Sequence, residues 1–219
     1  MGKKLELPQY SLAQELWNSI SHGLGALLVL IAAPFVFIKA IDSGDVLEIV
    51  SVSIYLPFIF LTFLMSCLYH SLAKNGGKRV LRVLDHDFVF LSIMGTYVPY
   101  CLVGLKGDPA WGYSILSIVW AGSITGIALN SVNLKKFNVV NIVLYIALGS
   151  TAVLAFYPLY VHLRLEAFLL LLFGGVAYWI GAMLYGLGGK KNLWFHAVFH
   201  FFVLFGAILM FLSIYLYVL

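Results

Sequence analysis

Seven long apolar runs dominate this sequence and restrict it to a helical membrane fold. A helix needs about 20 apolar residues, at a rise of roughly 1.5 Å each, to cross a bilayer. Lipid offers no hydrogen-bond partners, so each run must satisfy its own backbone, and continuous runs favour helices over the alternating pattern of barrel strands. The predicted spans are 20–38, 47–69, 88–105, 111–129, 139–156, 165–184 and 195–216.

The composition agrees with an all-α integral membrane protein of one domain. The chain of 219 residues is 63% hydrophobic and 10% charged, whereas soluble domains are about half apolar and a quarter charged. No polar block is long enough to fold separately, so we expect a single domain, 1–219, with residues 1–19 as a tail and interfacial segment. No nucleic-acid motif accompanies the net charge of +4, and Cys67 and Cys101 have no paired spacing that would indicate disulfides.

Basic residues gather in alternate loops, and this pattern predicts the orientation. Ten of the 13 fall on one side: Lys3, Lys4, Lys74, Lys78, Arg79, Arg82, Lys135, Lys136, Lys190 and Lys191. Lys39, Lys106 and Arg164 fall on the other side, mixed with acidic residues. The positive-inside rule therefore places the N-terminus in the cytoplasm, and an odd number of spans places the C-terminus outside.

A few ionisable or polar side chains interrupt the ends of the apolar runs. Burying such a group in a membrane costs roughly 2.5–3.5 kcal/mol on insertion scales, so each needs a partner or a function. They are His22, Ser66, His70, Asp85, His86, His196 and His200. With alternating spans, all of them lie at the cytoplasmic level of the membrane.

The spacing of the histidines predicts a metal site. His196 and His200 are four residues apart, so both imidazoles project from one helical face, and Ser66 and His70 repeat this spacing. An isolated pair of this kind is more often interfacial or hydrogen-bonded, but convergence with His70 and Asp85 at one depth favours metal binding. Three nitrogen ligands leave a fourth position open, as in catalytic zinc sites.

Other polar residues near these positions have two interpretations. Glu15, Asn18 and His22 could each place a polar group beside the site. Glu15 and Asn18 fit an interfacial helix start equally well, and His22 also fits hydrogen bonding at the water boundary. His86 neighbours Asp85, but adjacent residues of a helix face different directions. Direct binding of Asp85 or Cys67 as a fourth ligand would indicate a structural metal.

Five motifs in a fixed order connect the chain with known proteins. They are Glu-Leu-Trp-Asn-Ser-Ile-Ser-His-Gly at 15–23, Ser-Cys-Leu-Tyr-His at 66–70, Leu-Asp-His at 84–86, Gly-Thr-Tyr-Val-Pro at 95–99 and His-Ala-Val-Phe-His at 196–200. Together they resemble the bacterial hemolysin III family of the progestin and adipoQ receptor superfamily, which is similar to alkaline ceramidases. The chain departs from many members in having Met210 in place of a histidine and Asp87 in place of a small polar residue.

The resemblance implies a seven-helix bundle with an inward N-terminus. It also implies a Zn²⁺ ion held by His70, His196 and His200, with Asp85 near the water on the metal, and Ser66 matches the family serine. The site would then lie towards the cytoplasmic side of the plasma membrane.

Three functions fit these expectations. The first is zinc-dependent, ceramidase-like hydrolysis of a membrane acyl lipid, with Asp85 as the base and Ser66 as a hydrogen-bond donor, serving lipid homeostasis. The second is a membrane-fluidity regulator or receptor-like protein with a structural zinc, and the third is a cytolytic pore, as the hemolysin label implies. A lipid-sized cavity at the metal would favour the first, and a fourth protein ligand the second.

Overall fold

The computed structural model describes residues 5–188 and 192–219, and within these ranges the chain forms helices and no strand. The helices are α1 (Leu12–Asp42), α2 (Val46–Ser71), α3 (Gly76–Pro99), α4 (Pro109–Gly149), α5 (Phe156–His162), α6 (Leu165–Gly188) and α7 (Trp194–Ser213). Short π-helical turns, Tyr100–Gly104 and Ile214–Val218, extend α3 and α7. The predicted all-α class is confirmed.

Six helices of the described part are long and apolar enough to cross a membrane: α1, α2, α3 with its extension, α4, α6 and α7. The sequence predicted seven spans, and the difference lies in α4, which contains both 111–129 and most of 139–156. The backbone of Asn133 is not helical (φ −164°, ψ 90°), and its side-chain oxygen accepts a hydrogen bond from the Lys136 amide at 3.0 Å. Asn133 therefore caps the start of a second helical segment.

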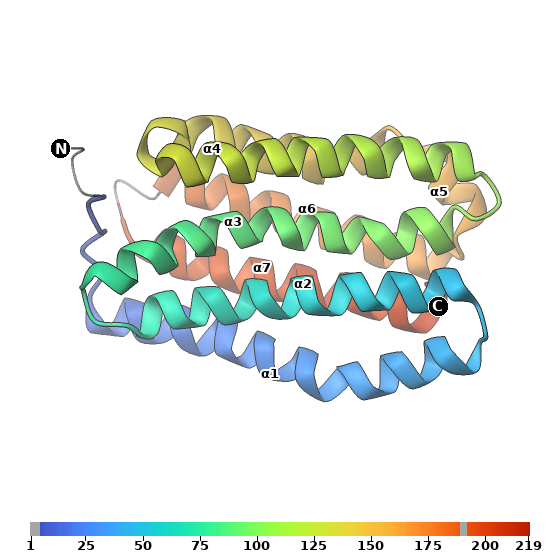
Figure 1. Ribbon diagram of the computed structural model, residues 1–219, viewed down its shortest axis with the longest axis horizontal. Coiled ribbons are helices and arrows are strands. Elements are labelled where there is room, and N and C mark those ends of the chain that lie inside the picture. The colour runs from blue at the N-terminus through green and yellow to red at the C-terminus, as the bar shows by residue number, and fades with distance from the viewer. Residues whose placement is uncertain (1–4, 189–191) are drawn as a thin grey trace.

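The two segments of α4 lie antiparallel. Leu148 of the second segment packs against Gly122 of the first, and Asn141 donates a hydrogen bond to Asn130. Figure 1 shows α4 turning back at the end where the N-terminus lies, with α5 at the opposite end. α4 is thus a helical hairpin that turns at Asn133.

The predicted span 139–156 ends too late. The helix ends at Gly149, where the Tyr97 hydroxyl shares its one hydrogen between the carbonyls of Leu148 (2.9 Å) and Gly149 (3.0 Å) and accepts from the Ala152 amide (2.8 Å). A 3₁₀ turn, Thr151–Val153, and the short α5 follow.

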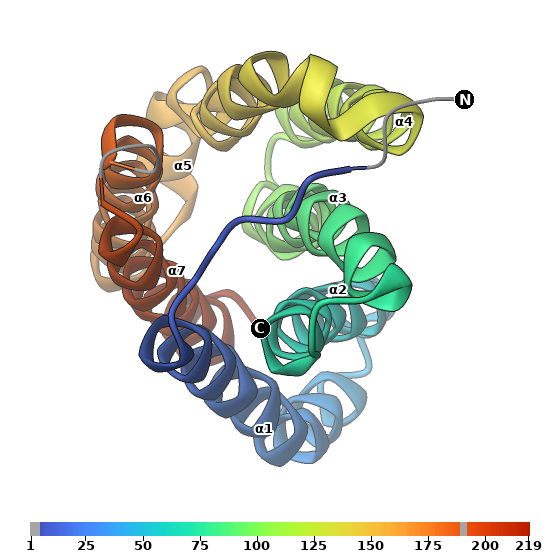
Figure 2. The same cartoon turned by 90° about the vertical axis from the view of Figure 1, so that its left-hand side faces the viewer.

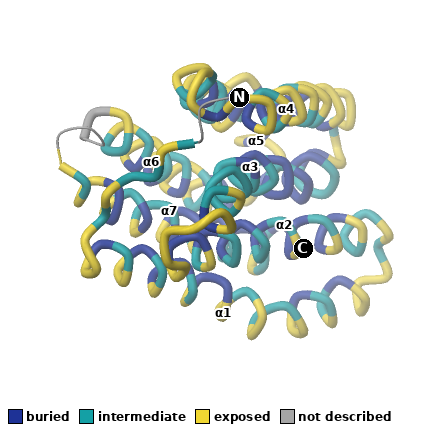
Figure 3. Tube along the Cα trace, turned by 60° about the vertical axis from the view of Figure 1, so that its left-hand side comes forward, coloured by how far each residue is buried: buried dark blue, intermediate teal, exposed yellow. Residues whose placement is uncertain are grey.

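The helices form a closed ring in the order α1, α2, α3, α4, α6 and α7, which the end-on view shows (Figure 2). Glycines allow close contacts within the ring: Gly25 lies against the Phe63 ring and Gly126 against the Phe90 ring. Exposed positions recur along the outer side of α1 (Figure 3), where Leu24, Ile31 and Phe35 are exposed. A continuous apolar outer surface of this kind suits contact with lipid.

Two helices begin earlier than the predicted spans. α1 starts at Leu12, where Ser11 and Gln14 form a capping box. α3 starts at Gly76, after the Asn75 side chain accepts from the Lys78 amide at 2.8 Å. Residues 12–19 of the predicted tail and interfacial segment are therefore helical, and Glu15, Asn18 and Lys78 lie on regular helical turns.

One end of the bundle carries the basic residues of the predicted cytoplasmic side, and we call it the basic end. There the N-terminal segment accepts hydrogen bonds from Lys74, Arg79, Arg82 and Lys135. At the opposite end Lys106 bonds Asp45 at 2.5 Å, which lowers the pKa of that carboxyl and raises the pKa of Lys106. Lys3, Lys4, Lys190 and Lys191, which belong to the same prediction, lie outside the described residues.

Candidate metal centre

Three buried histidines converge at the basic end of the ring. His70 lies at the end of α2, and His196 and His200 lie in the first turns of α7. The Nε2 atom of His196 is 3.3 Å from Nε2 of His70 and 3.2 Å from Nε2 of His200. Ligand atoms of all three lie within 4.8 Å of one another, so the structure brings together the three predicted ligands.

Hydrogen bonding alone does not account for this arrangement. A neutral imidazole nitrogen is either a donor or an acceptor, so Nε2 of His196 cannot donate to one neighbour and accept from the other. The Nδ1 atoms of His196 and His200 also find no partner among the described residues. Three imidazole nitrogens facing one point are suited to a shared cation.

The spacing fits a tetrahedral metal. With metal–nitrogen bonds of about 2.0–2.1 Å, tetrahedral ligand nitrogens lie about 3.3 Å apart, close to the two observed contacts. Zinc fits this ligand set, and imidazole also suits copper, iron and nickel. The group of three contains imidazoles only, with no fourth histidine, cysteine or carboxylate from the described residues.

Helix α1 supplies polar residues beside the group. Glu15 Oε2 lies 2.7 Å from Nδ1 of His70, and Asn18, which is fully buried, lies against the same nitrogen. His22 is buried and stacks on His200, with ring centroids 3.8 Å apart and planes at 24°.

Glu15, Asn18 and His22 therefore lie beside the three-histidine group, and Glu15 also stands in the first turn of α1. Both nitrogens of His22 lie without a partner among the described residues. The spacing of Glu15, Asn18 and His22, at i, i+3 and i+7, places them on one helical face, and this is the signal that could have indicated their role.

Ser66 and Asp85 line one cavity with His196 and His200, and its volume is about 180 Å³. Ser66 lies one turn before His70, is buried, and its hydroxyl finds no partner within the described part of the chain. Asp85 is half-buried in α3. His86 lines the same cavity without joining the three-histidine group.

Two further residues lie away from the group. Asp87 accepts a hydrogen bond from Ser131 of α4 at 3.2 Å and is not part of the cavity lining. Cys67 Sγ lies near the hydroxyls of Ser19 (3.6 Å) and Ser71 (4.0 Å), so it faces α1. Neither a second carboxylate from Asp87 nor a Cys67 ligand is supported.

The N-terminal segment, residues 5–10, crosses the basic end of the ring (Figure 2). Tyr10 stacks on His196, with ring centroids 5.2 Å apart and planes at 21°, and meets His70 edge-on at 5.5 Å. Burial raises the pKa of the Tyr10 phenol, so this side chain stays neutral at physiological pH. The segment therefore separates the histidine group from water at this end.

Replacing Tyr10 with alanine is expected to speed removal of the metal by a water-soluble chelator. An aromatic pair contributes about 0.5–1.5 kcal/mol, which corresponds to a roughly two- to tenfold faster loss. The measurement is the rate of metal transfer to excess EDTA, with Tyr113→Ala as the control because Tyr113 is an exposed residue of α4. Equal rates for Tyr10→Ala and the wild type would show that the segment does not cover the site.

Several long apolar helices, arranged as a ring around a buried three-histidine group, make the chain a multi-pass membrane protein with a candidate metal centre. A family model described as "Haemolysin-III related" matches residues 10–211, so the chain belongs to the haemolysin-III family. This confirms the family indicated by the sequence motifs.

Two curated relatives support the assignment. The chain is 35% identical to "Hemolysin-3 homolog" of Bacillus subtilis (strain 168) over 208 residues, covering 95% of this chain and 96% of that protein. It is 33% identical to "Hemolysin-3" of Bacillus cereus over 219 residues, covering 100% of this chain and 98% of that protein. The similarity extends through α1, α2, α3 and α7, which carry the site.

Proposed function

We propose that this protein is a zinc-dependent hydrolase of membrane acyl lipids, cleaving an amide bond in the manner of ceramidases and serving membrane lipid homeostasis. The observation that carries the proposal is the shared cavity, which His196 and His200 line together with Asp85 and with Ser66, whose hydroxyl has no partner among the described residues. A metal with a purely structural role needs neither a nearby carboxyl nor a cavity.

We also propose that the chain crosses the plasma membrane seven times, with the N-terminus in the cytoplasm. Each segment of the α4 hairpin would make one crossing, which brings the six long helices of the described ranges to seven crossings. The basic residues at one end support a cytoplasmic location for that end. The metal centre would then lie towards the cytoplasm.

The proposed chemistry divides between the metal and two side chains. His70, His196 and His200 would hold the zinc, which would supply an acidified water and polarisation of the acyl carbonyl. Asp85 accepts the proton of the attacking water as its oxygen bonds to the acyl carbon, and returns that proton to the leaving nitrogen when the carbon–nitrogen bond breaks. Ser66 donates a hydrogen bond to the developing oxyanion.

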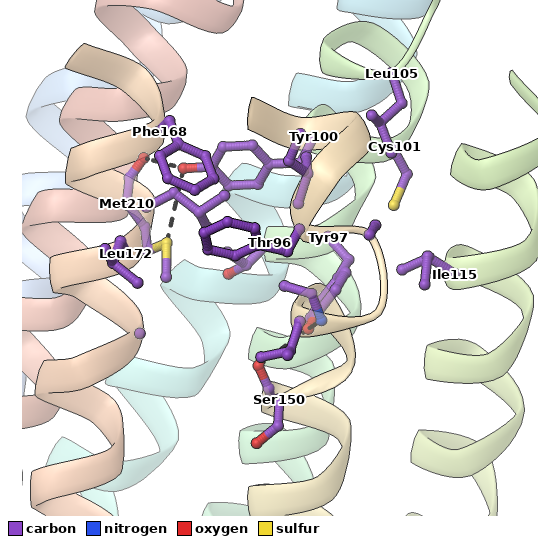
Figure 4. A pocket seen from close by; sticks show the side chains of 18 of the residues that line it. Thr96, Tyr97, Tyr100, Cys101, Leu105, Ile115, Ser150, Phe168, Leu172 and Met210 are labelled. Atoms are coloured by element: carbon purple, nitrogen blue, oxygen red, sulfur yellow. Dashed lines mark hydrogen bonds between the residues drawn. The ribbon is translucent and has the colours of Figure 1, made fainter. Parts of the chain in front are cut away.

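A second, apolar cavity of about 280 Å³ adjoins the first and supports a lipid substrate. Figure 4 shows its wall of aromatic and aliphatic side chains, including Tyr97, Tyr100, Phe168 and Met210. Six residues line both cavities: Thr96, Tyr97, Gly149, Gly175, Trp179 and Met210. An acyl chain could extend from the metal centre into this cavity, and the substrate would arrive from the bilayer because the N-terminal segment covers the basic end.

The second candidate is a non-enzymatic regulator of membrane fluidity, or a receptor-like protein, with a structural metal. It is favoured by the position of the ligands, since His70 lies on α2 and His196 on α7, and α1 separates these two helices in the order of the ring (Figure 2). A metal there would hold two non-adjacent helices together.

The third candidate is a cytolytic pore, because both relatives carry the name hemolysin. Selective pores need polar or charged linings, whereas the larger cavity of this chain is lined mainly by apolar side chains. A pore made by one copy of the chain is therefore the weakest of the three candidates.

The test is to offer purified, metal-loaded protein fluorescent ceramides and phospholipids in vesicles. We expect fatty-acid release from at least one lipid, stopped by a chelator and restored by zinc. If metal-loaded protein releases no acyl chain from the panel while it still alters lipid order, the hydrolase proposal fails and the structural-metal candidate replaces it. Dye leakage from the same vesicles would instead support the pore.

A further inference from the structure

Glu15, His70 and Lys78 form a connected chain across three helices. Glu15 of α1 places Oε2 2.7 Å from Nδ1 of His70 on α2 and Oε1 2.6 Å from Nζ of Lys78 on α3. The side chains of His70 and Lys78 are 0% and 3% exposed, and that of Glu15 is 14% exposed. A buried ion pair is costly to maintain and is poor evidence for stability alone, so its contact with a candidate ligand indicates another role.

Lys78 is held firmly in this chain. Its ammonium also donates to the Leu72 carbonyl at 2.9 Å, at the end of α2, and lies 5.1 Å from the centroid of the Tyr69 ring. These contacts fix the ammonium group beside Oε1 of Glu15. The other carboxylate oxygen then faces His70.

The short contact between Glu15 and His70 determines the tautomer of the imidazole. An ionised carboxylate only accepts hydrogen bonds, so Nδ1 of His70 must carry the proton. A neutral ring with its proton on Nδ1 presents a lone pair at Nε2, which is the atom that faces His196 at 3.3 Å. The Asn18 amide nitrogen, at 3.4 Å, cannot also donate to Nδ1, and the shorter contact decides between them.

This arrangement distinguishes His70 from the other two histidines. Nδ1 of His196 and Nδ1 of His200 lack hydrogen-bond partners among the described residues, whereas Nδ1 of His70 faces a charged acceptor. Only the ring from α2 is therefore oriented by a carboxylate.

We propose that Glu15 is a positioning residue of the metal centre, which holds His70 in the Nδ1-protonated form and directs Nε2 at the metal, while Lys78 holds Glu15 in place. The inference rests on the metal-binding part of the proposed function and is independent of the hydrolysis step. Loss of a residue that hydrogen-bonds a metal ligand typically lowers metal affinity by about 10- to 100-fold.

The first test compares Glu15→Gln with Glu166→Gln. Glu166 is a control because it is an exposed residue in the first turn of α6, where it pairs with Arg164 at 3.6 Å. Competition with a chelator is expected to show zinc affinity about 10- to 100-fold weaker for Glu15→Gln and unchanged for Glu166→Gln. The visible spectrum of the Co²⁺-loaded protein should also change for Glu15→Gln only, which a general loss of stability would not produce.

The second test uses the wild-type chain and so does not depend on the folding of a variant. Nitrogen-15 NMR of histidine-labelled, zinc-loaded protein should show His70 protonated on Nδ1 and metal-bound through Nε2. A His70 ring bound through Nδ1 would overturn the proposal, as would a Glu15→Gln protein with wild-type affinity and spectrum. Wild-type protein that binds no metal would overturn both this inference and the proposed function, whereas protein that binds zinc and hydrolyses nothing would overturn only the hydrolase.

Discussion

Replacing His196 with alanine is expected to remove the metal from the purified protein. Nε2 of His196 contacts both other imidazoles, so its loss leaves two nitrogen ligands on different helices and opens the centre of the group. We expect roughly one zinc per chain in the wild type and close to none in the variant after dialysis. This effect is larger than the about 10- to 100-fold loss of zinc affinity expected when Glu15 is replaced, because Glu15 binds a ligand and not the metal. Metal analysis against protein concentration measures this directly.

His162→Ala is the control for that result. His162 ends α5, is exposed and lies outside the three-histidine group. We expect His162→Ala to keep the full metal content. If His196→Ala kept it as well, the three histidines would not be the metal ligands.

Changing Asp85 to asparagine is expected to abolish most hydrolysis while leaving the metal in place. The amide keeps the shape of the side chain but cannot accept the proton, and general acid–base catalysis contributes about 10²–10⁴-fold to rates. We expect kcat for acyl release to fall by about that factor, with zinc content unchanged. The assay is initial-rate hydrolysis of the lipid found active in the panel.

Asp87→Asn is a matched control because Asp87 lies two positions along α3 and contacts Ser131 rather than the cavity. It should hydrolyse lipid at close to the wild-type rate. A parallel loss of metal and activity in Asp85→Asn would instead identify Asp85 as a direct ligand, which favours a structural metal. Unchanged activity would remove Asp85 from the mechanism.

The apolar runs and the histidine spacing predicted the helical membrane fold and the meeting of His70, His196 and His200. Both follow from strong local rules, since a long apolar run must be helical in lipid and residues four apart share a helical face. The charge pattern also predicted that Arg79, Arg82 and Lys135 lie on the same side, and the structure places them at one end of the bundle.

Boundaries and contacts that depend on single polar side chains were harder to predict. Hydropathy does not register the caps at Ser11 and Asn75 or the break at Asn133, so α1 and α3 begin earlier than predicted and two predicted spans share α4. The contact of Glu15 with His70 depends on the packing of α1 against α2, which sequence spacing within one helix does not reveal.

The covering of the site by Tyr10 was also not predicted. Its position depends on contacts between the N-terminal segment and the loops of the basic end, which join parts of the chain far apart in sequence. Local patterns carry no information about such contacts, because they arise only when the ring of helices has closed.

X-ray absorption at the zinc edge of the purified protein reports directly on the metal and its ligands. We predict bound zinc with three imidazole nitrogens at about 2.0 Å and one further oxygen neighbour. A sulfur neighbour at about 2.3 Å, fewer than three imidazoles, or no bound metal would contradict it.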